Sequence, residues 1–455
     1  MFTYAVPLLL QGELELQCRH NLLHDLFALQ DEIVQQIVTT LQLQLTLQEQ
    51  GLIVRKHTNN LEAYDAFLRG AEYFSRFTQE ANAQARQLFE KAIALDPQYA
   101  DAYVALAMTY LLEWDWRWST NPQTLERALA LAQQALALDD SLPGAHAIVS
   151  YIYALQQQPD QALTEGQRAL SLDPNNANSY AMQAQVLNNA GRPEDALRAV
   201  EQAMRLNPHY PPWYLVELGW AYRLTGRYAE AITVLNEAIS RNPNHLTAHL
   251  TMALSYLLQW VSQESPPTQT LEPAMAAVQR ALALNDSLHF NHIAQGYLFL
   301  YQHQYEQALA EMERAVALAP NEALSSAGLA WVLSCMGKTE DAQKAAARVL
   351  RLKAFSVDEH LGIVGTAYAV AEHYEEARAP LQRYLSRYPN FLPAHLMLAV
   401  VYSELGQVAE ARAEAAAVLR INPQFSLEVH RQRTPIKDPA VIERHLAALR
   451  KAGLK

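Results

Sequence analysis

The stretch HYPPWYLVELGWAYRLTGRYAEAITVLNEAISRNP, from His209 to Pro243, decides the fold. It contains two apolar patterns of helical period, and Gly226 stands between them at a position suited to a turn. Pro243 ends the second pattern, because proline cannot continue a helix. Small residues such as Gly219 and Ala231 let two antiparallel helices approach closely. The stretch therefore predicts a pair of packed helices joined by a short turn.

The same pattern recurs along the chain. Phrases of the type A-(I/L/V)-x-L-(D/N)-P end at Pro97, Pro174, Pro208, Pro243, Pro320, Pro389 and Pro423, and Asp140, Asp286 and Ala354 stand in the same slot. Most of these positions are 34 or 35 residues apart, and two spacings are 43. Units of this size stack on their neighbours and bury a continuous core. About ten helix pairs are predicted between Tyr64 and Pro423.

The spacings also indicate an internal duplication. The order 43, 34, 34, 35 occurs twice, which gives a superperiod of 146 residues and carries YLLEW at 110–114 onto YLLQW at 256–260. The spacings thus predict two blocks of four repeats plus two further repeats. Each block has a nine-residue insertion after the first helix of one unit. Trp114 and Trp260 correspond, so both are predicted to pack within the repeats. Trp116 and Trp118 have no counterparts and are candidates for an exposed loop contact, with half-buried anchoring of the loop as the alternative.

Composition agrees with an all-helical protein. The chain is rich in Ala, Leu and Gln, 18% of its residues are charged, and no long stretch alternates apolar and polar residues as a sheet would require. A formal charge of -12 disfavours binding to nucleic acid or to an anionic membrane, which both require clustered positive charge. Cys18 and Cys335 form neither a disulfide framework nor a CxxC pair, which favours a reduced, cytoplasmic location. The apolar opening MFTYAVPLLL is too short to span a membrane and lacks the basic start of a secretory signal.

The repeats resemble the tetratricopeptide repeat family, whose consensus is bulky-x2-Leu-Gly-x2-Tyr followed by Gly, Ala, Phe, Ala and Pro. In the quoted stretch the matching residues are Leu218, Gly219, Tyr222, Gly226, Ala231, Leu235, Ala238 and Pro243. The resemblance covers most of the chain and implies an all-α, right-handed α-solenoid of about ten helix pairs.

The two ends carry a further resemblance. The segment 24–41, HDLFALQDEIVQQIVTTL, has the pattern of an amphipathic helix. It resembles a segment that precedes the repeats in bacterial proteins joining a class III nucleotide-cyclase domain, or another output domain, to a TolB-like module. Residues 437–455 are similar to the closing helix of the same proteins. We therefore expect residues 1–60 to be a remnant of an upstream module, 61–423 to be the array, and 424–455 to hold a capping helix.

Few residues of the sequence are candidates for a catalytic, metal-binding or cofactor-binding site. His146, His249, His292 and His395 occupy the same position in different repeats, so they are expected to lie on successive helix pairs and to pack there rather than converge on a metal ion. No nucleophile motif, pair of catalytic carboxylates or nucleotide-binding loop is found. The sequence predicts a protein that is not an enzyme and has no metal or cofactor.

The resemblance implies that the first helix of each pair lines a concave groove. The positions expected to face it are Tyr151, Asn178, Gln185, Asn188, Trp213, Trp220, Arg223, Tyr297 and Trp331. Aromatic rings with amide and guanidinium groups suit an extended peptide or a partner helix. The alternative for each ring is packing between neighbouring helices.

Two functions are consistent with these observations. The first is a non-catalytic scaffold that binds a protein or peptide in the groove, without nucleic acid or membrane insertion. The second is the regulatory repeat half of a nucleotide-cyclase-type signalling system that lacks its catalytic domain. The partner, its peptide specificity, the pathway and the oligomeric state are not encoded in any pattern that the sequence shows.

Overall fold

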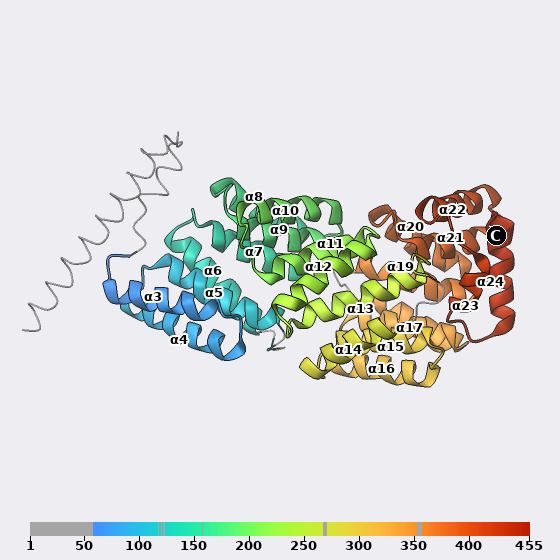
Figure 1. The fold of residues 1–455 in the computed structure, drawn as a ribbon, viewed down its shortest axis with the longest axis horizontal. Coiled ribbons are helices and arrows are strands. Elements are labelled where there is room, and N and C mark those ends of the chain that lie inside the picture. Colours follow the sequence, from blue (N-terminus) through green and yellow to red (C-terminus); the bar gives the residue numbers. More distant parts are fainter. Residues whose placement is uncertain are drawn as a thin grey trace, which may run out of the picture. The chain divides into compact units, whose positions relative to one another are not determined.

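The computed structural model describes residues 58–116, 118, 119, 121, 123–156, 158–266, 271–352 and 357–455. Over these residues every regular element is a helix, as Figure 1 shows, so the predicted all-α class is confirmed. The predicted helix at 24–41 lies outside the described residues, as does the rest of 1–57.

In chain order the described helices alternate as the first and second helices of the ten predicted pairs. The first helices are α3 (Leu61–Phe74), α5 (Ala100–Asp115), α7 (Pro143–Leu155), α9 (Ala177–Asn189), α11 (Pro212–Leu224), α13 (Leu246–Val261), α15 (His289–Tyr301), α17 (Ala323–Cys335), α19 (Val357–Val370) and α21 (Leu392–Glu404). The second helices are α4 (Gln79–Leu95), α6 (Gln123–Leu138), α8 (Pro159–Leu172), α10 (Pro193–Leu206), α12 (Tyr228–Arg241), α14 (Glu272–Leu284), α16 (Tyr305–Leu318), α18 (Thr339–Arg351), α20 (Tyr374–Arg387) and α22 (Val408–Ile421). From α9 to α22 each helix packs on its partner, and each first helix also touches the first helix of the next pair, as expected for an α-solenoid.

The α11–α12 pair shows why these residues fold in this way. Gly219 lets the helices approach closely, since a Cβ there would lie 2.6 Å from Leu235 Cγ. Leu235 is fully buried, which contributes about 1.5–3 kcal/mol. Gly226 adopts a left-handed φ of 82° in the turn, a conformation that glycine takes without a steric penalty. The backbone N–H of Asn242 bonds to the Ala238 carbonyl and ends α12.

The internal duplication is visible in the helix boundaries. α5 and α13 are both 16 residues long, whereas the other first helices have 13 or 14. Both ends of α5 recur 146 residues later as the ends of α13, and both ends of α12 recur at the same offset as those of α20. The predicted superperiod is therefore kept at both ends of these helices, and each long helix precedes a predicted insertion.

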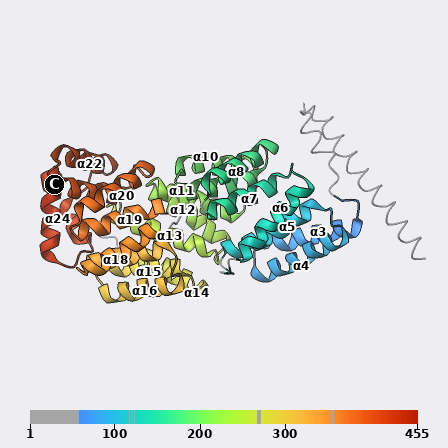
Figure 2. The ribbon, with the colours of Figure 1, turned by 180° about the vertical axis from the view of Figure 1, so that it is seen from behind.

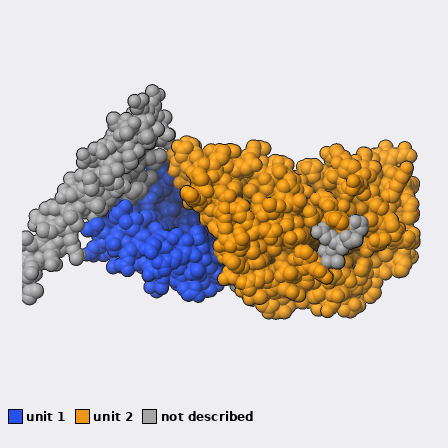
Figure 3. All heavy atoms as spheres, viewed as in Figure 1, with its two compact units in different colours: residues 1–148 blue, residues 149–455 orange. Residues whose placement is uncertain are grey.

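The chain divides into two compact units, residues 1–148 and 149–455, coloured separately in Figure 3. In unit 1, α3, α4 and α5 bury a small core that includes Ala63, Ala92 and Tyr99. Unit 2 holds the largest core, which extends from α15 to α24. The boundary between the units falls inside α7.

Two helices follow the last pair, α23 (Leu427–Arg433) and α24 (Pro439–Ala452). α24 packs on α21 and α22 and buries Leu446 and Leu449 in the largest core. The Ser403 hydroxyl donates to the Ala448 carbonyl across this contact at 3.0 Å. α24 therefore covers apolar side chains of the last helix pair.

Unit 2 also contains contacts between segments far apart in sequence. Arg387 at the end of α20 donates to the Ala190 carbonyl after α9 at 2.9 Å, and Gly226 lies beside Asn390. Figures 1 and 2 show α20 near α11 from opposite sides. A solenoid whose repeats touched only their neighbours would lack these contacts.

Candidate partner-binding surface

Residues from the first helices α9 and α11 meet around one tyrosine. Tyr214 is fully buried, and its hydroxyl donates to Asn178 Oδ1 at 2.7 Å. The half-buried Trp213 ring makes an edge contact with Tyr214, with centroids 4.5 Å apart. The structure thus brings the predicted Asn178 and Trp213 together through Tyr214, which the sequence analysis did not select. Burial raises the pKa of the Tyr214 hydroxyl well above its usual value.

Asn188 has a structural partner from the next repeat. Its Nδ2 donates to the Glu217 backbone carbonyl at 3.1 Å and to Glu217 Oε2 at 3.3 Å. Both side chains are buried, and they join α9 to α11. Glu217 was missed, although an acidic residue inside the apolar run YLVELGW is a signal that its carboxylate has a buried partner.

The Tyr297 hydroxyl on α15 is a buried group without a hydrogen-bond partner among the described residues, and Trp220 and Arg223 offer two further unused donors. The latter two stand one turn apart on α11, so their side chains share a face of the helix, and both are half-buried. Trp220 Nε1 and Arg223 Nε are buried atoms without a hydrogen-bond partner among the described residues. A buried donor without an acceptor costs about 1–3 kcal/mol, so a ligand oxygen placed here would be stabilised.

Of the other predicted groove residues, two are more deeply buried than Trp220 and Arg223, and two are half-buried like them. Tyr151 and Trp331 are buried, and Trp331 belongs to the largest core. Tyr297 packs from α15 onto α17, where a Cβ added to Gly328 would lie 3.3 Å from its hydroxyl oxygen. Gln185 is half-buried on α9. A contact with a partner stays a prediction for all four.

The tryptophans of the first insertion lie in unit 1. The Trp116 ring stacks on Phe77 with centroids 6.0 Å apart, and Trp118 meets Trp116 edge-on at 5.3 Å. The Trp118 backbone N–H bonds to the Glu113 carbonyl at 2.9 Å, which holds the loop against the end of α5. Both rings are half-buried, and their role as a loop contact stays a prediction.

The four repeated histidines make the same contact in each of their four repeats. Nε2 of each ring meets the backbone carbonyl oxygen of the residue six positions earlier, at distances between 2.7 and 3.0 Å, and the residues involved are His146, His249, His292 and His395. All four side chains are almost fully buried. They occupy separate repeats, as the sequence predicts.

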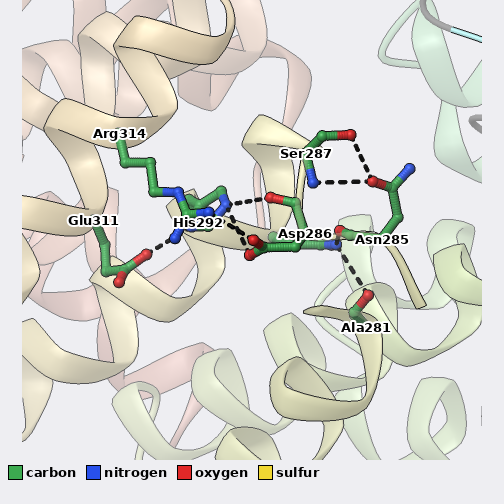
Figure 4. Close-up of polar contacts among 8 residues, drawn as sticks. Ala281, Asn285, Asp286, Ser287, His292, Glu311 and Arg314 are labelled. Atoms are coloured by element: carbon green, nitrogen blue, oxygen red, sulfur yellow. Dashed lines mark hydrogen bonds and ion pairs between the residues drawn. The ribbon is translucent and has the colours of Figure 1, made fainter. Parts of the chain in front are cut away.

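Figure 4 shows the contacts of His292, which has a further side-chain partner. His292 Nδ1 lies 2.7 Å from Glu311 Oε2 on α16, while Arg314 pairs with the Asp286 carboxylate at 2.6 Å. The two ring nitrogens face oxygens from two different segments, the Asp286 carbonyl and the Glu311 carboxylate. The nearby Ser287 hydroxyl donates to Asn285 Oδ1 at 2.8 Å and takes no part in the histidine contacts. The arrangement links α15, α16 and the preceding turn.

Nowhere in the described ranges do three or more His, Cys, Asp or Glu side chains gather in a way that could hold a metal ion. Among the described helices, none is long and apolar enough to cross a membrane.

Comparison with protein families adds a sequence relationship. One family model for the tetratricopeptide repeat matches residues 187–254 and 371–431, and a second model of the same description matches 88–120 and 166–198. The first match includes α11 and α12, which carry the stretch quoted at the start.

Comparison with individual proteins gives a partial match. A protein of Rhizobium meliloti (strain 1021) named "Putative adenylate cyclase 3" is 29% identical over 140 residues, which is 30% of this chain and 24% of that protein. The match thus spans about a quarter of the length of that relative.

The chain is also similar to two solved structures. The APC/C hetero-tetramer Cut9-Hcn1 covers 89% of this chain and 80% of its own at 15% identity and a TM-score of 0.46. A tetratricopeptide repeat protein from Parabacteroides merdae ATCC 43184 covers 60% and 99% at 14% identity and a TM-score of 0.39.

Proposed function

We propose that this chain, whose helix pairs are tetratricopeptide repeats, is a non-catalytic scaffold that binds an extended peptide or partner protein on the first helices of its central repeats. The observation that carries the proposal is the pair of buried donors on α11, Trp220 Nε1 and Arg223 Nε. Tetratricopeptide repeats suggest a role in protein–protein interaction, and these donors support α11 as part of the proposed partner-binding surface.

The chemistry of the site favours a carboxylate-bearing partner. Arg223 carries a positive charge, and no ion pair is found for it among the described residues. The N–H groups of Trp220 and Arg223 lie on the same face of α11, so both can donate to oxygen atoms of one ligand. The half-buried Trp213 ring and the exposed Asn178 lie on the same pair of first helices and extend the surface with an apolar and an amide contact. An extended chain with an acidic side chain fits this combination.

The test uses two substitutions that remove donors and keep the packing. Trp220→Phe keeps an aromatic ring without an N–H, and Arg223→Met keeps an unbranched chain without charge. An array of twelve-residue peptides, each made with Asp/Glu and with Asn/Gln in their place, identifies binders, and calorimetry then gives Kd. We expect carboxylate peptides to bind, and Arg223→Met to weaken them by about tenfold or more, since a hydrogen bond to a charged group contributes about 1.5–3 kcal/mol.

Arg205→Met on α10 is the matched control, because Arg205 is exposed and bonds Gln202 of its own helix. We expect it to leave Kd unchanged. Equal affinity in wild type, Arg223→Met and Arg205→Met would refute the proposed surface. Loss of helicity or of melting temperature in Trp220→Phe, with unchanged affinity, would assign that ring to the core.

The partial match to a cyclase-named protein supports a second candidate function, the regulatory repeat half of a nucleotide-cyclase-type system. In that case the partner is a catalytic cyclase domain, and residues 24–41, outside the described ranges, supply the contact. Adding the full chain to a purified class III cyclase domain distinguishes the two candidates. A change in cyclase rate that persists in Arg223→Met favours the second.

A cytoplasmic location completes the proposal. Two cysteines without a disulfide pattern suit a reducing compartment, and a net charge of -12 suits neither nucleic acid nor an anionic membrane as partner. Fractionation of the host cell tests the location directly.

A further inference from the structure

The insertion that follows α13 contacts the end of the array, about 160 residues later. Gln263 Nε2 donates to the Ser426 carbonyl at 3.0 Å, and the Ser426 backbone N–H donates to Gln263 Oε1 at 3.0 Å. Asn422 Nδ2 donates to the carbonyls of Ser262 at 3.0 Å and Gln263 at 3.3 Å. One side-chain amide on each segment thus pairs with the backbone of the other.

Arg433 is the central residue of this contact. Its guanidinium carbon lies 4.7 Å from the centre of the Trp260 ring, and its nitrogens donate to the carbonyls of Trp260, Ser265 and Pro266. The side chain is 6% exposed, so the charge is almost fully desolvated. Trp260 belongs to the last turn of α13, where carbonyls without helical partners give the helix a negative end. Arg433 therefore caps α13 from a distant part of the chain.

The contact is polar, unlike the packing within the repeats. The hydrogen bonds of this contact join side chains to backbone groups. Among the described helices, by contrast, those that pack extensively on each other are at most three elements apart along the chain. A second polar contact, from Arg387 at the end of α20 to the Ala190 carbonyl after α9, also joins an early part of unit 2 to a late part. Interfaces of this composition between well-packed bodies permit relative motion more readily than an apolar core does.

We infer that residues 260–266 and 422–433 form a clasp, a reversible contact that holds the α13 side of unit 2 against its α22–α24 side. The clasp opens without unfolding the helices on either side. Phe425 and Leu427 are buried in the largest core, so α23 stays with α24 when the clasp opens. The insertion stays with α13, whose helix continues directly into it. Opening separates these two bodies, and the repeats between them supply the flexibility. The inference is independent of the partner proposed above, since it concerns contacts within one chain.

The test measures hydrogen exchange and X-ray scattering of the full chain without a partner. Arg433→Met keeps the packing on Trp260 and removes the donors, and Gln263→Ala removes the paired amide from a half-buried loop position. In each variant we expect the Ser426 amide to exchange about tenfold faster or more, together with a larger radius of gyration. Arg420→Ala on α22 is the control, because this exposed residue lies next to the clasp and outside its contacts.

Two results would overturn the clasp. One is Ser426 exchange in both variants equal to that of Arg420→Ala. The other is faster exchange at Ser426 matched by equally faster exchange of the α24 amides, which would show that the C-terminal core unfolds instead of separating as a body. Using two variants on opposite sides of the contact guards against a folding defect of either one.

Discussion

His292 holds three chain segments together with one ring. Its nitrogens contact the Asp286 carbonyl and the Glu311 carboxylate, and its side chain is 1% exposed. Removing the ring leaves a cavity and a carboxylate without its partner. We predict that His292→Ala lowers the free energy of unfolding by about 2–4 kcal/mol, measured by urea denaturation followed by circular dichroism.

His303→Ala is the control for this prediction. His303 is exposed and bonds Tyr305 of its own turn, so its loss is expected to change stability by less than about 0.5 kcal/mol. Similar losses of stability in both variants would show that the buried contacts of His292 contribute no more than those of an exposed histidine.

At the residue scale, position within the repeat predicts a helix face better than it predicts a partner. The pattern selects Asn188 as a groove residue, and the structure shows it buried and bonded to Glu217. The partner comes from the next repeat, so its identity depends on side-chain conformations that the period does not contain. Tyr214 was missed for the same reason, since its bond to Asn178 crosses between repeats.

Among the elements, α11 and α12 are held at close range by Gly219 and Leu235. We predict that Gly219→Ala alone destabilises the chain by about 1–3 kcal/mol through overpacking, and that Leu235→Ala alone costs about 2–5 kcal/mol through a cavity. In the double variant the added methyl group occupies the space that the leucine leaves. Its loss is expected to be smaller than the sum of the single losses, as a double-mutant cycle of urea midpoints measures. Strict additivity would mean that the two side chains do not compete for space.

Element boundaries were the most predictable part of this fold. Glycine in the turns and proline after the second helices mark helix ends by local backbone chemistry, as at Gly226 and Pro243. The docking of the second insertion was not predictable, because Gln263 and Arg433 are 170 residues apart in a sequence whose pattern repeats every 34. Local periodicity carries no information about which distant loops meet.

Acid sensitivity belongs to the molecule as a whole, because it depends on buried histidines in several repeats. His430 and His445 face each other with their Nε2 atoms 3.1 Å apart, and burial lowers the pKa of His430 to about 4. Burial, together with the neighbouring His430, lowers the pKa of His445 to about 3. Burial also lowers the pKa values of His245 and His360 to about 4.

These groups are neutral in the folded chain and protonate near pH 6.5 when the chain unfolds. Below pH 6.5 the unfolded state therefore binds more protons, and stability falls as the pH falls toward 4; above pH 6.5 these histidines contribute no pH dependence. We predict a loss of up to about 1.4 kcal/mol per pH unit for each histidine, measured as urea midpoints between pH 7.5 and 5. His445→Gln should reduce the slope, while His209→Gln, at an exposed site, should not. An unchanged slope in His445→Gln would contradict the assignment.

The constant offset of 146 residues between α5 and α13, and between α12 and α20, also has a genetic consequence. Recombination between the two copies of the block within the gene joins one helix to its counterpart at the same position. Such an event removes or adds a whole block and leaves every junction between helices regular. The length of this protein can therefore change in a single inherited step, without passing through an intermediate that has a broken repeat.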